Sequence, residues 1–296
     1  MSGMDPGSVI VPGGGGGSTP TGTGYRRVTA GVEDAAAATA AQVAADLATS
    51  RRSDVATVAT TRLRYRCQDT SGGLDNIGSL GATGDLTDDG ALAFQALAAG
   101  STVGRGVRCT GSVGSHASGV AGYGGAGTYA ASTTAFSVWA LAVIDAVPTG
   151  GAVIAKDWAS SGPWNAPYIS WGIFVDGSPA SAWRFEAAYG ADGSGSYASE
   201  QIAAPTWAVG SQHHFAVTYD GTTVKLYLDG SLVKTATHAG GVDWNTADTS
   251  SLTHVACTRN GDRGTLTVLD WELREAVMTA DQIAETYQRL VGTWGG

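Results

Sequence analysis

Three carboxylates near the end of the sequence have a spacing that catalysis could use. Asp270, Glu272 and Glu275 stand in LDWELRE, residues 269–275. Residues two apart on a strand face the same side, and two carboxylates about 5–5.5 Å apart can serve as nucleophile and general acid in glycoside hydrolysis. Arg274 shares the face of Asp270 and Glu272, and such a row is typical of a solvated, salt-bridged surface. We therefore expect a structural role here and no enzymatic activity.

Aromatic residues in glycine- and proline-rich stretches offer a second kind of chemistry, because a flat ring exposed in a loop can stack on a sugar ring. They crowd into KDWASSGPWNAPYISWG (156–172) and recur in GVAGYGGAGTYAAS and GGVDWNTAD. The alternative for each ring is packing in the core or against its own loop. The candidate glycan-binding residues are Trp158, Trp164, Tyr168, Trp244, Tyr123 and Tyr129. Three tryptophans within predicted strands are expected in the core: Trp139, Trp183 and Trp271.

Composition and charge narrow the class of protein. A hydrophobic content of 43% indicates a packed core, and 44 glycines indicate many turns. The net charge is −9 and the 17 lysines and arginines are spread along the chain, so no nucleic-acid partner is expected. No apolar stretch approaches the roughly 20 residues of a membrane span, and no secretion signal is visible, so we expect neither membrane insertion nor secretion. Cys67, Cys109 and Cys257 lack metal-site spacing and are predicted to be free thiols, buried or half-buried; a pairing of Cys67 with Cys109 stays open.

The chain divides into three parts by composition. Residues 1–24 contain five consecutive glycines and three prolines, which predicts an extended, flexible docking arm. Residues 25–54 include the alanine-rich stretch 32–50, predicted to be a short helix. On it Val43 and Leu47 continue an apolar stripe, so they are candidate assembly residues. Packing of this helix on its own domain is the alternative.

Residues 55–296 have the sequence pattern of a β-domain, with short apolar runs separated by Gly, Asp, Asn and Ser. The stretch HHFAVTYDGTTVKLYLDGSLV (213–233) alternates apolar residues and carries two Asp-Gly pairs, which are typical of tight hairpin turns. A closing helix is predicted over 279–290, with Thr279 as N-cap and Gln282 as its capping-box partner. The predicted strands are Arg62–Cys67, Val103–Cys109, Phe136–Ile144, Trp171–Val175, Trp183–Tyr189, His214–Tyr219, Val224–Leu228, Leu252–Cys257 and Leu266–Leu273.

Four segments in order resemble laminin-G-like domains of the concanavalin A-like superfamily. They are YRCQDTSGGLDNIGSLGATGDL (65–86), FSVWALAVI (136–144), the hairpin stretch 213–233, and LDWELREAVMTADQIAETY (269–287). The resemblance covers about residues 61–292 and implies an all-β fold, a two-sheet antiparallel jelly-roll sandwich. Two residues depart from the family pattern. Gln212 stands where the family usually has Trp, with Trp207 the nearest, and Glu272 replaces a basic or apolar residue.

The resemblance also implies ligands and activities. Some members of the superfamily are glucanases, but their Glu-x-Asp-x-x-Glu order is the reverse of the order found here. Others hold calcium, and Asp69, Asp75 and Asp270 match the acidic positions, which makes calcium a candidate cofactor. His213 and His214 are adjacent on a strand and face opposite ways, so we assign them to structure and not to a metal.

The order of arm, helix and jelly roll is similar to that of a bacteriophage virion protein. We expect a minor tail, tail-tip or fibre protein, located in the virion and assembled in the host cytoplasm. Its expected partners are other virion proteins through the arm, further copies of itself in a homo-oligomer such as a trimer, and a host-surface glycan. A capsid decoration protein of the same fold and a polysaccharide-cleaving glycoside hydrolase are the alternatives.

Overall fold

The structure is a computed structural model. It describes residues 9–12, 25–29, 32–37, 60–67, 73–75, 77–79, 85–88, 92–96, 105–109, 117–119, 135–147, 152–159, 169–176, 182–189, 197–203, 207–242, 251–255 and 266–294. The chain forms two units, one of residues 1–56 with 289–295 and one of residues 57–288 with residue 296. No helix among the described residues is long and apolar enough to cross a membrane.

The first unit contains a small antiparallel sheet of β1 (Val9–Pro12), β2 (Tyr25–Thr29) and β3 (Val32–Ala37). The prediction of a helix over 32–50 is therefore wrong for Val32–Ala37, and Val9–Pro12 is a strand within the predicted arm. Thr29 pairs with Val32 across two residues, which is hairpin spacing. Strand pairing overrides the helix propensity of alanine here, because propensity is a weak prior. Val43 and Leu47 lie outside the described residues, so their assembly role stays a prediction.

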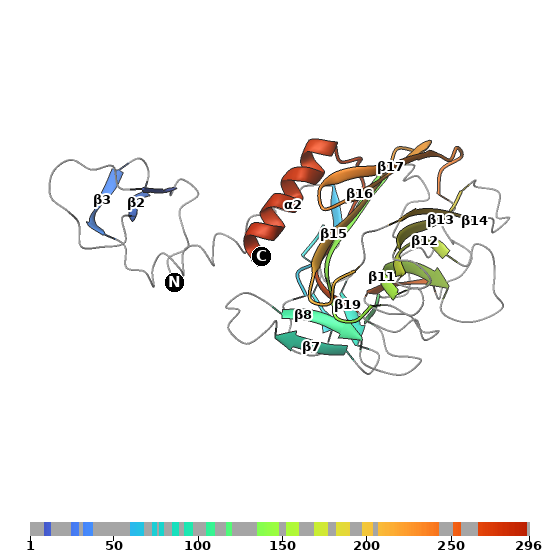
Figure 1. The fold of residues 1–296 in the computed structure, drawn as a ribbon, viewed down its shortest axis with the longest axis horizontal. Coiled ribbons are helices and arrows are strands. Elements are labelled where there is room, and N and C mark those ends of the chain that lie inside the picture. Colours follow the sequence, from blue (N-terminus) through green and yellow to red (C-terminus); the bar gives the residue numbers. More distant parts are fainter. Residues whose placement is uncertain are drawn as a thin grey trace. The chain divides into compact units, whose positions relative to one another are not determined.

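The second unit contains two antiparallel sheets, which confirms the predicted jelly-roll sandwich (Figure 1). The first sheet has the order β17 (Ser231–Thr237), β16 (Thr223–Leu228), β15 (Gln212–Tyr219), β10 (Phe136–Ile144), β19 (Leu266–Arg274), β8 (Arg105–Cys109), β7 (Leu92–Ala96), with β4 (Thr61–Tyr65) also paired to β19. The second sheet has the order β14 (Tyr197–Ala203), β13 (Ala182–Ala188), β12 (Ile169–Asp176), β11 (Ala152–Ala159), β18 (Ser251–Val255), β9 (Ala117–Gly119), β6 (Leu86–Asp88), β5 (Gly73–Leu74).

The predicted hairpin stretch forms β15, β16 and β17 as a meander. Gly221, Asp229 and Gly230 have φ angles of 95°, 50° and 78°. These positive angles are what tight hairpin turns require, and Asp-Gly accepts them with little strain. The Asp220 carboxylate also accepts hydrogen bonds from the backbone N–H groups of Thr222 and Thr223, at 2.9 and 2.6 Å.

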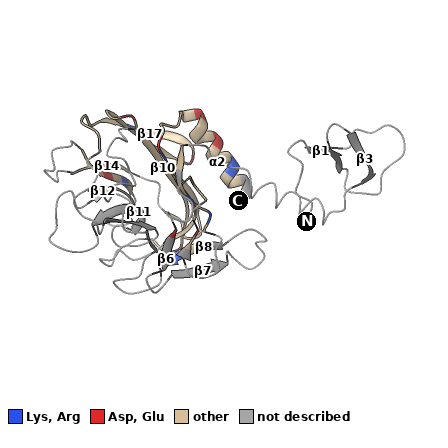
Figure 2. Cartoon of the chain, turned by 180° about the vertical axis from the view of Figure 1, so that it is seen from behind, with Lys and Arg blue, Asp and Glu red and all other residues tan. Residues whose placement is uncertain are grey.

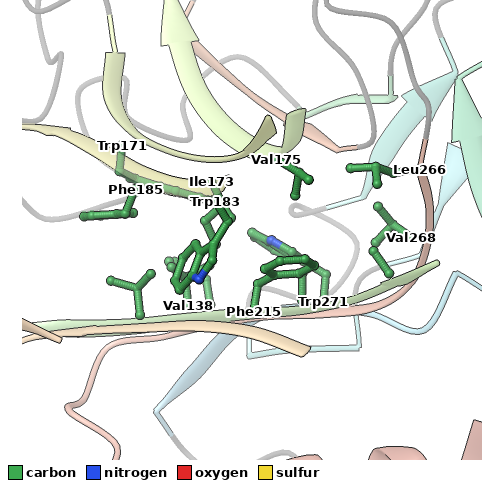
Figure 3. Packing of buried hydrophobic residues seen from close by; sticks show 14 of the residues in the cluster. Val138, Trp171, Ile173, Val175, Trp183, Phe185, Phe215, Leu266, Val268 and Trp271 are labelled. Carbon is green, nitrogen blue, oxygen red and sulfur yellow. The ribbon is translucent and has the colours of Figure 1, made fainter. Parts of the chain in front are cut away.

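The core lies between the two sheets, and Figure 3 shows the side chains of both sheets pointing toward one another. Trp271 of β19 stacks on Trp171 of β12, with ring centroids 6.1 Å apart, and on Tyr65 of β4 at 5.3 Å. Trp183 of β13 meets Phe215 of β15 edge to face at 5.7 Å. All five side chains are buried, so the aromatic contacts join the sheets as well as neighbouring strands.

A bulge in β19 changes the predicted alternation. The register between β10 and β19 shifts after the Leu141–Asp270 pair, so that Ala142 pairs with Val268. The extra residue, Leu269, is buried but does not belong to the core cluster that contains Val268 and Trp271. Strict alternation would place Leu269 on the inward face with Trp271, but the bulge moves this one residue out of the alternation.

Gly106 of β8 gives a test of how tightly β8 packs against β19. A Cβ atom at this position would lie 2.1 Å from Cγ2 of Thr267 and 2.8 Å from Cδ2 of Leu269. We expect Gly106→Ala to destabilise the domain by about 1–3 kcal/mol through overpacking, measured by urea unfolding. Adding Thr267→Ser removes the clashing methyl and keeps the hydroxyl that donates to Asp145 at 2.6 Å, so the double variant should regain most of the loss. Equal stability of Gly106→Ala and the parent would contradict this packing.

The closing helix α2 (Ala280–Trp294) begins as predicted. The Thr279 N–H donates to Oε1 of Gln282 at 2.9 Å, and the Gln282 N–H donates to Oγ1 of Thr279 at 3.2 Å, which is a capping box. Ile283 is buried, and Tyr287 packs against the β16–β17 turn, where a Cβ added to Gly230 would lie 3.0 Å from Cδ1 of Tyr287. The helix therefore covers part of the outer face of the first sheet (Figure 1).

Candidate functional site

The strand register brings the predicted glycan-binding segments to one end of the second sheet. Ala159, the last residue of β11, pairs with Ser251, the first residue of β18. Trp158 pairs with Ile169, the first residue of β12. β9 runs antiparallel to β18, with Ser118 paired to His254, so β9 ends at Gly119 toward the beginning of β18. Three of the connections that leave or enter the sheet at this end carry predicted glycan-binding aromatics: residues 120–135, 160–168 and 243–250.

The matching end of the first sheet lies beside it. Phe136, the first residue of β10, pairs with Tyr219, the last residue of β15. Thr223 and Thr237, the first residue of β16 and the last of β17, pair with one another. Tyr189, which follows β13, lies 5.5 Å from Tyr219 between ring centroids. We call the strand ends at Phe136, Ala159, Ile169, Tyr189, Tyr219, Thr237 and Ser251 the aromatic end.

The six predicted glycan-binding aromatics all belong to segments that meet the aromatic end. Tyr123 and Tyr129 are in connection 120–135, Trp164 and Tyr168 in connection 160–168, and Trp244 in connection 243–250. Trp158 stands beside Ala159 at the end of β11. The side chains of these six residues lie outside what the structure describes, so their contacts stay a prediction. Trp171, from the same sequence cluster, is in the core.

A polar and aromatic cluster holds the described start of the Trp244 connection. The His238 ring stacks on Tyr189 with centroids 4.2 Å apart, and its Nε2 lies 2.6 Å from Oε1 of Glu200. Lys234 donates to Oε2 of Glu200 at 2.7 Å. The Tyr219 hydroxyl donates to the carbonyl oxygen of His238 at 2.6 Å. This cluster lies where β14 and β17, the edge strands of the two sheets, approach each other, and sequence reasoning did not single out any of its members as a site.

The pKa values in this cluster reflect burial and pairing. Burial, with Tyr219 and Glu200 nearby, raises the pKa of Tyr189 well above its ordinary value. For Glu200 burial favours the protonated form, but hydrogen bonds from Lys234 and His238 outweigh it and lower the pKa. The Glu200 carboxylate is therefore charged at neutral pH and fixes two side chains of the opposite sheet edge.

The row Asp270, Glu272 and Arg274 is salt-bridged as predicted, but it is buried and not solvated. Arg64 of β4 donates to Oδ2 of Asp270 at 3.0 Å and lies 3.7 Å from Oε2 of Glu272. Thr61 and Arg274 both donate to Oε1 of Glu272, at 2.7 and 2.8 Å. The relative exposure of Asp270, Glu272 and Arg274 is 4%, 0% and 7%. Alternation identifies which side of a strand a residue faces, but not whether another element covers that side.

This arrangement does not fit calcium at Asp270. The Arg64 guanidinium is the cation beside Asp270, and a bound calcium would have to displace it. Burial raises the pKa of Asp270 to about 6, although Arg64 and Arg66 act to lower it. Asp75 is exposed and Asp69 lies outside the described residues. Among the residues that the structure describes, no group of three or more His, Cys, Asp or Glu could hold a metal.

A Ser–His–Asp arrangement stands at the opposite end of the first sheet. Oγ of Ser211 lies 3.0 Å from Nε2 of His213, and Nδ1 of His213 lies 2.8 Å from Oδ2 of Asp229. These distances match a catalytic triad, but nucleophilic catalysis also needs N–H donors for an oxyanion. The nearest backbone donors are engaged: Gly210 donates to Ile144 and Ser211 to Ala208, at 2.7 and 3.0 Å. The three side chains therefore join the turn before β15 to the β16–β17 turn.

Trp207, the tryptophan nearest to Gln212 in the sequence, packs against the beginning of β15. Its ring meets His213 at 5.0 Å and Phe215 at 5.9 Å, both edge to face, and its Nε1 donates to the carbonyl oxygen of Asp176 at 2.8 Å. Trp207 therefore packs on the inward side of the beginning of β15, where His213 and Phe215 both point. His213 has the structural role that was predicted.

His214 is fully buried on the outer side of β15. Its ring lies 5.7 Å from Trp139 and 6.0 Å from Tyr287 of α2 between centroids. Neither ring nitrogen has a hydrogen-bond partner among the described residues. Burial lowers the pKa of His214 to about 4, although Asp229 acts to raise it. The ring is therefore neutral at neutral pH.

This buried histidine predicts a loss of stability in acid. Between pH 6.5 and about 4 the unfolded chain binds a proton at His214 and the folded chain does not, so stability falls as pH falls, by about 1.4 kcal/mol per pH unit. Asp270 acts in the opposite direction, because its folded pKa of about 6 exceeds the ordinary 3.8. Comparing the free energy of unfolding of His214→Phe with that of the parent isolates the effect of the histidine. The variant should become more stable relative to the parent by about 3 kcal/mol as the pH falls from 6.5 to 4. If urea unfolding showed the same stability difference between variant and parent at every pH from 6.5 to 4, the lowered pKa of His214 would be contradicted.

The fold and its register define a concanavalin A-like jelly-roll domain. Residues 119–263 match the family described as the Concanavalin A-like lectin/glucanases superfamily (Laminin_G_3). This match confirms the resemblance that the sequence motifs predicted. No curated protein matches the sequence.

Solved structures with the same fold include toxin and sialidase domains. The receptor binding domain of botulinum neurotoxin C/D mosaic serotype is 12% identical with a TM-score of 0.55, over 77% of this chain and 51% of that one. The botulinum neurotoxin serotype D ligand binding domain in complex with N-acetylneuraminic acid is 11% identical with a TM-score of 0.54, over 78% and 51%. Trypanosoma rangeli sialidase in complex with sialic acid is 17% identical with a TM-score of 0.53, over 80% and 34%. The chain thus spans about half or less of these proteins, and at such identities the likeness concerns the fold.

Proposed function

We propose that this chain is a bacteriophage virion protein, a minor tail, tail-tip or fibre component, whose jelly-roll domain binds a glycan of the host surface at the aromatic end. The observation that carries the glycan-binding proposal is the register of the described strands. It directs three connections, which hold five of the six candidate aromatics, to one end of the sandwich. Several rings gathered in one place are what sugar stacking requires.

The structural neighbours and the division of the chain support the proposal. Similar jelly rolls include a botulinum neurotoxin ligand binding domain in complex with N-acetylneuraminic acid. Residues 1–56 together with 289–295 form one unit, which contains a small sheet and suits attachment to other virion proteins. Several copies on one particle would multiply a weak affinity for sugar through their high effective concentration.

Glycan binding is tested on the full chain with an oligosaccharide array followed by calorimetry. We expect Trp164→Ala with Tyr168→Ala to weaken binding about tenfold, because each stacked ring contributes about 0.5–1.5 kcal/mol. The matched control is Val209→Ala, which removes an exposed apolar side chain (66% exposed) at the opposite end of β15. Binding that is equal in the double variant and the parent, or an array on which no glycan is retained, would refute the proposed site.

The virion role has its own test. Gold-labelled antibodies against this chain should mark the tail tip or fibres in electron micrographs of the particles. Labelling of the head would favour a capsid decoration protein instead. Release of reducing sugar from a bound glycan would favour the glycoside hydrolase alternative.

A further inference from the structure

The described basic side chains at the aromatic end are already paired with carboxylates. Lys234 contacts Glu200, with Nζ 2.7 Å from Oε2. Arg274, the last residue of β19, contacts Glu272, with Nη2 2.7 Å from Oε1, and only 9% of its side chain is exposed. Neither cation is free to neutralise a ligand without first losing its partner.

Arg184 is paired in the same way farther along β13, and Lys225 of β16 lies close enough to Asp220 for its charge to act on that carboxylate. Lys225 of β16 helps to lower the pKa of Asp220, whose largest cause is the hydrogen bond from the Thr223 N–H. Arg184 of β13 donates to Oδ2 of Asp176 at 2.9 Å and also contacts Glu186. The guanidinium of Arg184 lies over the Phe174 ring, 4.4 Å from its centroid. In Figure 2 the strands that are not grey are mainly tan, with few blue or red positions.

The connections at this end add negative charge and no positive charge. Residues 120–135, 160–168, 190–196 and 243–250 contain no lysine, arginine or histidine. They contain three aspartates: Asp192, Asp243 and Asp248. The lysine nearest to Trp158 along the chain, Lys156, is followed directly by Asp157. These connections therefore supply rings, hydroxyls, amides and carboxylates but no cation, and the described cations Lys234 and Arg274 are paired with carboxylates.

Proteins usually recognise the carboxylate of an acidic sugar with an arginine fork or a lysine. Carboxylates close to such a ligand repel it, and the repulsion is strongest within a Debye length of about 8 Å. A neutral sugar has no such requirement, since its hydroxyl groups bond to carboxylates and amides and its ring faces stack on aromatics. The fold neighbours in complex with N-acetylneuraminic acid or sialic acid would then differ from this chain in ligand charge.

We infer that the aromatic end binds an uncharged glycan and discriminates against sialylated and other acidic glycans. This inference rests on the proposed glycan-binding function and deepens it. The discrimination arises because Lys234 and Arg274 are paired with carboxylates and the connections at this end carry aspartates but no cation. Uncapped sugars on a host surface are therefore the ligands, and capping them with an acidic residue blocks recognition.

The test compares pairs of oligosaccharides that differ only in a terminal sialic acid, such as N-acetyllactosamine and its sialylated form, on an array with the full chain. The neutral member of each bound pair should bind about tenfold more tightly. Its affinity should also change less than twofold between about 20 mM and 500 mM NaCl, because no ion pair is formed. Hits whose sialylated form binds equally or more tightly, or whose affinity falls steeply with salt, would overturn the inference and leave glycan binding intact. Retention of no glycan would overturn both.

Discussion

Replacing Arg64 with Met should destabilise the domain by about 3–5 kcal/mol, because it leaves Asp270 without its cation in a buried position. Arg64 is 1% exposed, donates to Asp270 at 3.0 Å, and places its guanidinium carbon 5.3 Å from the centre of the Trp139 ring. Met fills similar volume beside Trp139, so the expected loss is mainly electrostatic. Guanidinium unfolding of the parent and the variant at pH 7.5 measures it.

Two further measurements separate charge from packing. The double variant Arg64→Met with Asp270→Asn no longer buries the uncompensated carboxylate, so it should regain at least half of the loss. The loss in the single variant should also shrink as pH falls toward 4. Without Arg64 the folded pKa of Asp270 rises above its present value of about 6, and a protonated Asp270 no longer needs a cation. A loss that is independent of pH, and that Asp270→Asn does not reduce, would assign the effect to packing instead.

The sequence predicted the strands best where local chemistry determines them. Asp220-Gly221 and Asp229-Gly230 set the turns of the β15–β17 meander, because Asp-Gly accepts the positive φ that these turns need. β10 has the predicted bounds, and β19 extends one residue beyond them. The capping box of Thr279 and Gln282 fixes the start of α2. In each case the signal lies within a few residues of the feature it predicts.

Strands without such signals were missed. β11 (AVIAKDWA) and β14 (YASEQIA) lack a strict alternation of apolar and polar residues, and β9 consists of Ala, Ser and Gly. Their pairing partners define them, and partners distant in sequence leave no local trace. At Val32–Ala37 the local signal was misleading: the alanines have a strong helix propensity, but the strand depends on pairing with β2.

The candidate site was predictable in its residue types and not in its geometry. The candidate aromatic residues in glycine-rich connections could be recognised individually from the sequence. That their connections meet at one end follows from the pairing of β11 with β18 and of β18 with β9. Likewise, alternation placed Asp270 and Glu272 on the outer side of β19. It did not reveal that Arg64 of β4, over 200 residues earlier, lies against that side. Function at the aromatic end therefore depends on long-range register, and any change that shifts β11 or β18 should move all three connections together.

Trp271→Ala should be the most damaging change in the core, at about 3–5 kcal/mol. Trp271 is fully buried and touches both layers of the sandwich, through Tyr65 of β4 at 5.3 Å and Trp171 of β12 at 6.1 Å. Alanine leaves a cavity between the sheets that the surrounding strands can fill only in part, since β19 is paired to both β10 and β4. Urea unfolding followed by far-UV circular dichroism should show a lower midpoint.

The control for this core variant is Trp271→Phe. The indole N–H of Trp271 has no acceptor among the described residues, so Phe removes no hydrogen bond there and keeps a ring between Tyr65 and Trp171. Its loss should be less than half that of Trp271→Ala, because the cost grows with the volume of the cavity left behind. Equal losses for Phe and Ala would show that the indole nitrogen, and not the filling of the space between the sheets, makes the contribution. Because β19 carries Asp270 and Glu272 on its other side, Trp271→Ala should also weaken the effect of Arg64→Met, so that the two losses together fall short of their sum.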